Sequence, residues 1–415
     1  MRRQSSEEWP SWRLFAGAAI AWSLLGGFAS GALLFAARWI GRGELGTPAL
    51  AVVHGRVQVF GFVLLMTIGV LYWFLPRLWG VPAAPGTHPG AALGLFTSGA
   101  ILAVVGHLAE FGPVVTVAAA LETGGAVVVM RDILGLLRRR AEPGKGDDPA
   151  LLAALGSAAL ALPSAFVVQG LAPTGLLPIG LALSFSLAFH GVLVPIALAM
   201  SARLFPLYFR TRLPVRRVLA AALAVNAAGL AIRTWGLARD WAVGVRFGSV
   251  LEGAAILAAI GALQLLAPRQ RRPAAARVLW RDPTTYLVHA AYCCLGCDAV
   301  LLMWAGVVGA TVAGTLEWHL VGVGYLTGLI LGVGTHLLPG FARRRQCSER
   351  AAWGIFVGYL AMTALRLVAA VVAGTRAAPA GTAAGIVGLV TLTVFAWNSR
   401  ILDAANREHR REPTC

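Results

Sequence analysis

The sequence carries little charge for its length, and most of that charge is positive. Charged residues make up 13% of the 415 residues, with 35 Lys and Arg against 18 Asp and Glu, whereas 58% are hydrophobic and the mean hydropathy is +0.74. Soluble domains carry about 25% charged residues, so this composition excludes an ordinary soluble domain. Lysine occurs once, as Lys145, in a predicted loop.

Cysteine is also scarce, and its number is odd. The five residues are Cys293, Cys294, Cys297, Cys347 and Cys415. We expect most of them within the membrane or on its cytoplasmic side, where a disulfide framework is excluded. Cys294 and Cys297 share a helix face, which leaves apolar packing or soft-metal and redox chemistry as alternatives.

Long apolar runs dominate the chain. About 12 of them reach the roughly 20 residues that a membrane-spanning helix needs. We place them near 14–37, 48–76, 90–109, 112–136, 150–169, 177–205, 215–234, 247–267, 285–310, 317–339, 351–373 and 380–401. The fold class predicted is therefore all-α, a polytopic membrane protein.

No separate soluble domain is expected between these runs. The first run is too long for the core of a signal peptide and lacks a convincing small-residue cleavage site, so we expect a membrane helix. The longest predicted loops, near 137–149 and 268–284, are too short to fold alone. The chain is predicted to form a single transmembrane domain over residues 1–415.

The basic residues are distributed unevenly between the two predicted membrane faces. With loops assigned alternately, one face carries 27 Lys and Arg and the other carries 6. Clusters at 138–140, 269–272 and 343–345 all lie on the rich face. The positive-inside rule then predicts a multi-pass protein of the inner (plasma) membrane with both termini cytoplasmic. We interpret the clusters as topology signals beside anionic lipid, without a nucleic-acid partner.

One pattern recurs three times along the chain. In each copy a Gly precedes a Pro by 15 residues, as in Gly61 and Pro76, Gly191 and Pro206, and Gly324 and Pro339. The copies are 130 and 133 residues apart, on the second, sixth and tenth predicted helices. Internal repeats of this kind indicate repeated structural units. We predict three four-helix pseudo-repeats, at about 1–140, 141–275 and 276–415, related by a pseudo-threefold axis along the membrane normal.

Three histidines lie on the repeated helices. His54 lies 22 residues before Pro76 and His319 lies 20 before Pro339, so helix rise puts them within about 3 Å of the same depth. His190 lies 16 residues before Pro206, about 6–9 Å deeper. Two imidazoles at matched depth suit axial ligation of a haem iron. A hydrogen-bonded structural role is the alternative for each histidine, His190 included.

The stretch from His54 to Phe62, followed by Tyr72 to Arg77, resembles the second helix of the NnrS family and of short relatives of haem-copper oxidase subunit I. The stretches from His319 to Tyr325 and from Leu337 to Phe341 are similar to the tenth helix of the same group. The resemblance implies a membrane protein that binds haem b, with copper as a second candidate metal. It also implies a role in nitric oxide handling or membrane redox chemistry, with a small gaseous ligand such as nitric oxide.

On these grounds we expect His54 and His319 to bind both cofactor and metal, His190 to be a further metal ligand, and Arg56 to bind the cofactor. Arg56 stands where the family has a second histidine. An arginine at this depth needs an anionic partner, for which we expect a haem propionate, Glu110 or Glu122.

The chain also departs from the oxidases. Its seventh predicted helix has no histidine, and His319 and His336 lie at opposite ends of the tenth. An oxygen-reducing binuclear centre and proton pumping are therefore not expected. A secondary transporter and a cofactor-free assembly or interaction protein stay open as alternatives.

Further candidates are the remaining polar residues of the apolar runs. His107 is a candidate for the outer site, and His289 with His336 for an inner metal site. Asp298 and Arg366, each near the middle of a run, are expected to form a buried ion pair or to line a polar path.

Overall fold

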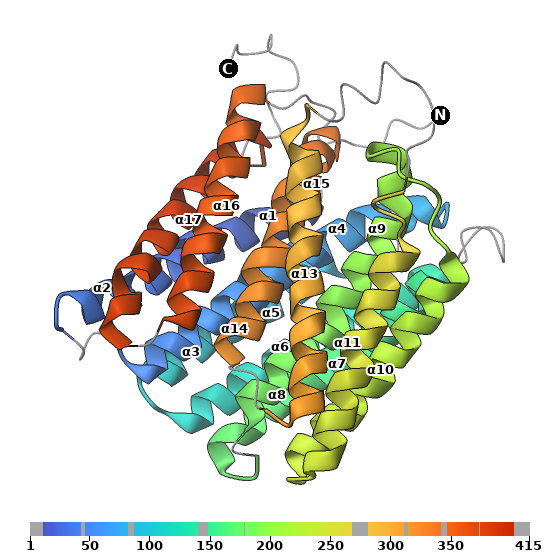
Figure 1. Ribbon diagram of the computed structural model, residues 1–415. Helices are drawn as coiled ribbons and strands as arrows, with labels where there is room; N and C mark the ends of the chain where they lie inside the picture. Colours follow the sequence, from blue (N-terminus) through green and yellow to red (C-terminus); the bar gives the residue numbers. More distant parts are fainter. Residues whose placement is uncertain are drawn as a thin grey trace.

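The computed structural model describes residues 11–42, 46–81, 87–139, 148–177, 179–267, 281–310, 314–341, 347–372 and 374–401. Within these ranges all regular elements are helical and no strand occurs, so the all-α prediction is confirmed for the described part of the chain. The long helices form one bundle (Figure 1). Lys145, Cys415 and the basic clusters at 269–272 and 343–345 lie outside the described residues.

Twelve helical spans in the described residues are long and apolar enough to cross a membrane. In chain order they are α1–η1–α2 (Ser11–Trp22, Ser23–Phe28, Ala29–Trp39), α3–η3–α4 (Pro48–Arg56, Val57–Leu64, Leu65–Leu78), α5 (Pro89–Leu108), α6 (Gly112–Arg138), α7 with the short 3₁₀ turn η4 (Pro149–Leu171, Ala172–Thr174), α8–η5–α9 (Gly180–Ser186, Leu187–Leu193, Val194–Tyr208), α10 (Arg216–Ala238), α11 (Ala242–Ala262), α13 (Pro283–Val308), α14–η6–α15 (Gly314–His319, Leu320–Thr327, Gly328–Phe341), α16 (Glu349–Val371) and η7–α17 (Gly374–Ala377, Ala378–Asn398). We number them as spans 1 to 12.

The predicted apolar runs match these spans closely. The largest difference is at span 8, predicted at 247–267 and found at Ala242–Ala262, five residues earlier at each end. The count is even, so Ser11 and Asn398 begin and end the spans at the same end of the bundle. The structure thus shows a multi-pass topology, while the choice of membrane and the cytoplasmic side stay predictions.

Several spans begin at recognisable helix caps. The side chains of Thr47, Asp148, Asp282 and Ser348 each accept a hydrogen bond from a main-chain N–H in the first turn of spans 2, 5, 9 and 11. A proline follows directly after the first three, where its missing N–H costs nothing. Span 9 ends at Gly309, whose φ of 72° is the left-handed conformation that glycine adopts readily.

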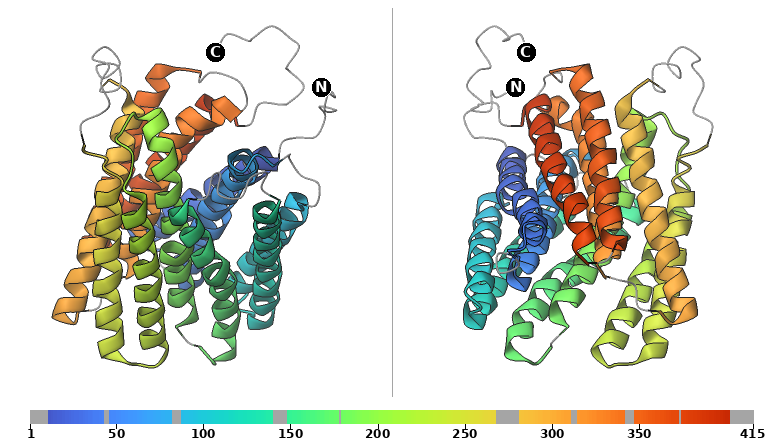
Figure 2. Two further views of the ribbon diagram at one scale, coloured as in Figure 1. Left: turned by 90° about the vertical axis from the view of Figure 1, so that its right-hand side faces the viewer. Right: turned by 60° about the vertical axis from the view of Figure 1, so that its left-hand side comes forward.

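Spans 2, 6 and 10 form the centre of the bundle. They have 72%, 78% and 67% of their most apolar window buried, whereas no other described span exceeds 50%. The other nine spans pack in one closed path around them, from span 1 through 3, 4, 5, 7, 8, 9, 11 and 12 back to span 1. Figure 2 shows the bundle from two further sides.

Each central span contains a segment of π-helix. The three segments, η3, η5 and η6, contact one another at the centre and begin at Val57, Leu187 and Leu320, which are 130 and 133 residues apart. These are the intervals of the sequence repeat. Single-turn π segments are frequent at functional sites. The recurrence is local, and a threefold axis relating three whole units stays a prediction.

Candidate functional site

A cavity of about 320 Å³ lies beside the π segments of the central spans. Residues of spans 1, 2, 6, 10, 11 and 12 line it. Its volume is at the lower end of the range of about 300–1,000 Å³ found for ligand sites. The walls are mainly apolar, and the polar exceptions are Arg38, His54, Gln58, Thr315, His319, Thr327 and Arg366.

His54 is held on the cavity wall by a main-chain carbonyl of a neighbouring span. Its Nδ1 lies 2.9 Å from the carbonyl oxygen of Gly27, and 3.4 Å from the hydroxyl of Ser30. A carbonyl oxygen can only accept, so Nδ1 carries the hydrogen and Nε2 carries the lone pair. The ring is therefore fixed in the tautomer that can bind a metal through Nε2.

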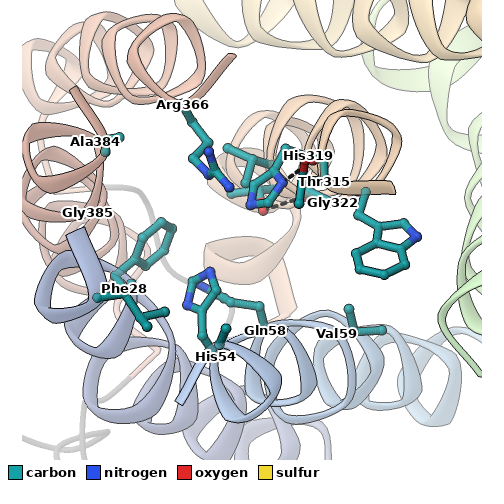
Figure 3. A pocket seen from close by; sticks show the side chains of 18 of the residues that line it. Phe28, His54, Gln58, Val59, Thr315, His319, Gly322, Arg366, Ala384 and Gly385 are labelled. Carbon is teal, nitrogen blue, oxygen red and sulfur yellow. Dashed lines mark hydrogen bonds between the residues drawn. The ribbon is translucent and has the colours of Figure 1, made fainter. Parts of the chain in front are cut away.

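His319 is held in the same way from within its own helix. Its Nδ1 hydrogen-bonds the carbonyl oxygen of Thr315, one helical turn earlier. Nε2 again carries the lone pair. Figure 3 shows that both imidazoles point into the cavity from opposite walls, His54 from span 2 and His319 from span 10. The structure thus brings together the two histidines that the sequence placed at matched depth.

Two arginines form a positively charged wall of this cavity. The guanidinium of Arg366 lies 5.1 Å from the ring centre of Phe35, and that of Arg38 lies 5.8 Å from the same ring. Figure 3 shows Arg366 beside His319. Among the described residues neither arginine forms an ion pair with a carboxylate. A cation within a membrane span needs an anionic partner, so this wall is suited to a negatively charged group.

Glycines allow span 1 to pack closely against spans 2 and 12 beside the cavity. A Cβ on Gly31 would come 2.7 Å from Cε1 of His54, so no larger residue fits beside the ring in its present position. On span 12, Gly381, Ala384 and Gly385 line the cavity, and the last two are labelled in Figure 3. A Cβ on Gly381 would clash with the ring of Phe35, and one on Gly385 would lie 2.7 Å from Cβ of Ala32, so these glycines let span 12 pack closely against span 1.

Arg56 is not at the cavity. Its Nη2 lies 2.8 Å and 2.6 Å from the two carboxylate oxygens of Glu122 on span 4, and both side chains are buried. Of the three anionic partners expected for Arg56, the structure shows Glu122. Because the guanidinium is used by this carboxylate, its expected role as a cofactor-binding residue gains no geometric support. Arg366 and Arg38 line the cavity instead.

His190 lies in a separate, fully buried group of charged residues. Its Nδ1 is 3.2 Å from Oε1 of Glu252, and its Nε2 is 3.2 Å from Oε1 of Glu317. Both ring nitrogens thus face carboxylates. No group of three or more His, Cys, Asp and Glu residues in the described ranges is arranged to hold a metal ion. A metal role for His190 stays an untested expectation, and it is no part of the site proposed below.

The expected pairing of Asp298 with Arg366 was wrong. The carboxylate of Asp298 lies 4.0 Å from Nε2 of His190, whereas Arg366 faces the cavity. Spans 9 and 11 pack against each other, but these two side chains leave from different faces. The position of each residue along its run predicted a similar depth for Asp298 and Arg366. It could not predict which face of each helix carries the side chain.

The other candidate histidines, His107, His289 and His336, also lie away from the cavity. His336 pairs with Asp282, with Nε2 at 2.9 Å from Oδ2, and is 2.6 Å from the hydroxyl of Thr284. The Nδ1 of His289 donates to the carbonyl oxygen of Thr285 at 2.7 Å. Each of these two histidines therefore has its own local partner. His107 does not line the cavity.

Sequence reasoning missed Glu317, Glu252 and Arg233 as interacting residues. Arg233 contacts both glutamates, at 2.9 Å from Glu252 Oε2 and 3.1 Å from Glu317 Oε1. Ionisable residues inside apolar runs are an available signal, because they are rare and usually face the interior. Among the acidic residues of the apolar runs, Glu122 and Asp298 were considered, but Glu252 and Glu317 were not.

No protein-family model matches the chain, and no curated protein matches it in sequence. The resemblance to the NnrS family rests on the quoted blocks of spans 2 and 10 and on the predicted plan of 12 helices in three repeats.

Proposed function

We propose that the cavity binds one b-type haem, with Nε2 of His54 and Nε2 of His319 as the axial ligands. One observation carries the proposal. Each imidazole is anchored through Nδ1 to a main-chain carbonyl, and both turn Nε2 into the same cavity from opposite walls. Histidines that bind metals usually have their second nitrogen fixed in this manner.

The other residues of the cavity fit the same group. A haem has an apolar ring and two carboxylates, and the cavity offers apolar walls together with the guanidinium groups of Arg38 and Arg366. The position of Gly31 lets the His54 ring stand against span 1. When bound, haem supplies one-electron redox chemistry, and the residues here would orient it and shield it from water.

A membrane redox role follows from the two-histidine ligation. If His54 and His319 held the haem together, a gaseous ligand such as nitric oxide would have to compete with one of the two histidines. We therefore propose electron transfer within a membrane, or NnrS-like handling of nitric oxide with exchange of one ligand. Oxygen reduction and proton pumping are not proposed, since the seventh span has no histidine. Copper is not included either.

Haem content of the purified protein tests this function. We expect stoichiometric haem in the wild type, loss of most haem in the double variant His54→Ala/His319→Ala, and wild-type content in His289→Ala. His289 is a matched control, because its Nδ1 is likewise bonded to a carbonyl four residues earlier but its ring lies outside the cavity. Haem-free wild-type protein, expressed with adequate haem supply, would contradict the proposal and favour the cofactor-free or transporter alternative.

A further inference from the structure

Five ionisable side chains from five consecutive spans meet in the interior of the bundle. They are His190 (span 6), Arg233 (span 7), Glu252 (span 8), Asp298 (span 9) and Glu317 (span 10), and none is more than 6% exposed. We call this group the buried charge cluster. Charges at such positions are costly unless they balance one another.

Two cations and two carboxylates of the cluster form a balanced set. Arg233 contacts Glu252 through Nε at 2.9 Å and through Nη2 at 3.1 Å, and contacts Glu317 through Nη1 at 3.1 Å. Each nitrogen of His190 lies 3.2 Å from an oxygen of one of the same glutamates. A neutral imidazole would direct a lone pair at one of these carboxylates. With both glutamates ionised beside Arg233, each nitrogen carries hydrogen, which makes His190 the second cation.

Asp298 is the carboxyl group left over. It is completely buried, and neither of its oxygens has a hydrogen-bond partner among the described residues. Its ion-pair contact among the described residues is with Nε2 of His190 at 4.0 Å, and that nitrogen is closer to Glu317. An ionised Asp298 would give the cluster one net negative charge in an apolar interior without hydrogen bonds to stabilise it.

We propose that Asp298 and His190 form a buried proton-binding site, in which Asp298 holds an exchangeable proton. When the proton dissociates from the carboxyl oxygen it passes to solvent, and the cluster then carries one net negative charge. The charged groups that face the site are Arg233 from span 7, Glu252 from span 8 and Glu317 from span 10. The amide of Asn226, also on span 7, donates to the main-chain oxygen of His190 at 2.8 Å and fixes that residue in place. The site does not depend on the proposed haem.

Infrared spectroscopy of the full-length protein in detergent tests the site. A protonated carboxylic acid has a C=O stretch well separated from that of a carboxylate, and the band shifts in deuterated water if the proton exchanges. We expect wild-type protein to show such a band near neutral pH, Asp298→Asn to lose it and Asp298→Glu to keep it at a shifted frequency. Glu122→Gln is the matched control, because Glu122 is equally buried but paired with Arg56, and it should leave the band unchanged.

Thermal unfolding separates this outcome from misfolding. Asparagine has the shape of the neutral acid, so Asp298→Asn should unfold at or above the wild-type temperature. A band that persists in Asp298→Asn, its absence from wild-type protein, or failure to shift in deuterated water would overturn the proposal. So would a large loss of stability in Asp298→Asn, because that result indicates an ionised aspartate held by a partner. None of these results depends on whether the protein binds haem.

Discussion

His54 donates its Nδ1 hydrogen to the carbonyl oxygen of Gly27 across 2.9 Å, and this bond joins span 2 to span 1 at the wall of the cavity. The bond fixes both the tautomer and the direction of the imidazole. Beside it, Gly31 leaves the ring just enough room. Span 1 therefore sets the orientation of the His54 ring, although span 1 itself contributes no proposed haem ligand.

Gly31→Ala tests this orientation. The new methyl group would lie 2.7 Å from Cε1 of His54, so the ring must turn or span 1 must move. We expect at least a tenfold loss of haem affinity, measured by titrating haem into haem-depleted protein. Gly17→Ala is the control on the same span, because a Cβ there meets nothing within 4 Å. Equal affinity in the two variants would show that the position of the His54 ring does not control binding.

The positive charges of Arg38 and Arg366 on the cavity wall predict an electrostatic contribution to haem affinity. Removing one charge-assisted hydrogen bond costs about 1.5–3 kcal/mol, so Arg366→Gln should weaken haem binding by roughly 10- to 100-fold. Arg239→Gln provides the comparison, since Arg239 is exposed and contacts the ring of Trp235 away from the cavity. If both variants bind haem like the wild type, Arg366 does not bind a propionate.

The pair of Arg56 and Glu122 predicts an effect on stability. Both side chains are buried, and breaking such a pair leaves one charge without its partner, at a cost of about 3–5 kcal/mol. Arg56→Leu and Glu122→Leu should each lower the unfolding temperature markedly. The double variant should be more stable than either single variant. Purely additive losses would mean that the two side chains stabilise the fold separately.

A pH dependence is expected from the cap of span 9. Burial opposes ionisation of Asp282, but hydrogen bonds with His336 and Thr284 outweigh it and hold the pKa of Asp282 below its usual value of 3.8. A lowered pKa stabilises the fold above about pH 4, and this stabilisation is lost as the pH falls through the lowered value. Asp282→Asn keeps a side chain that can cap the helix. In this variant the unfolding temperature should depend less on pH in the acidic range. If the unfolding temperature of Asp282→Asn varied with pH in parallel with that of the wild type, Asp282 would not be the group responsible.

The fold was largely predictable because membrane spans are encoded locally. A run of about 20 apolar residues spans a bilayer whatever its neighbours are, so hydropathy found all twelve spans of the described chain. The depth of His54 and His319 followed from helix rise along equivalent spans. Both residues do line one cavity.

Features that depend on contacts between spans could not be predicted in this way. Arg366 faces the cavity and Asp298 faces His190, and this difference depends on the rotation of each helix, which packing determines. The π segments η3, η5 and η6 likewise occur where the three central spans contact one another. The partners of Glu317 come from spans 6 and 7, far apart in sequence, so no local pattern joins them.

Electron paramagnetic resonance of the oxidised protein tests most directly whether His54 and His319 are both iron ligands. Two imidazole ligands give a low-spin ferric haem, and the loss of either should convert it to high spin or release it. The account predicts a low-spin signal in wild-type protein and in His289→Ala, and its loss in both His54→Ala and His319→Ala. A low-spin signal that survives in either of those two variants would contradict the account.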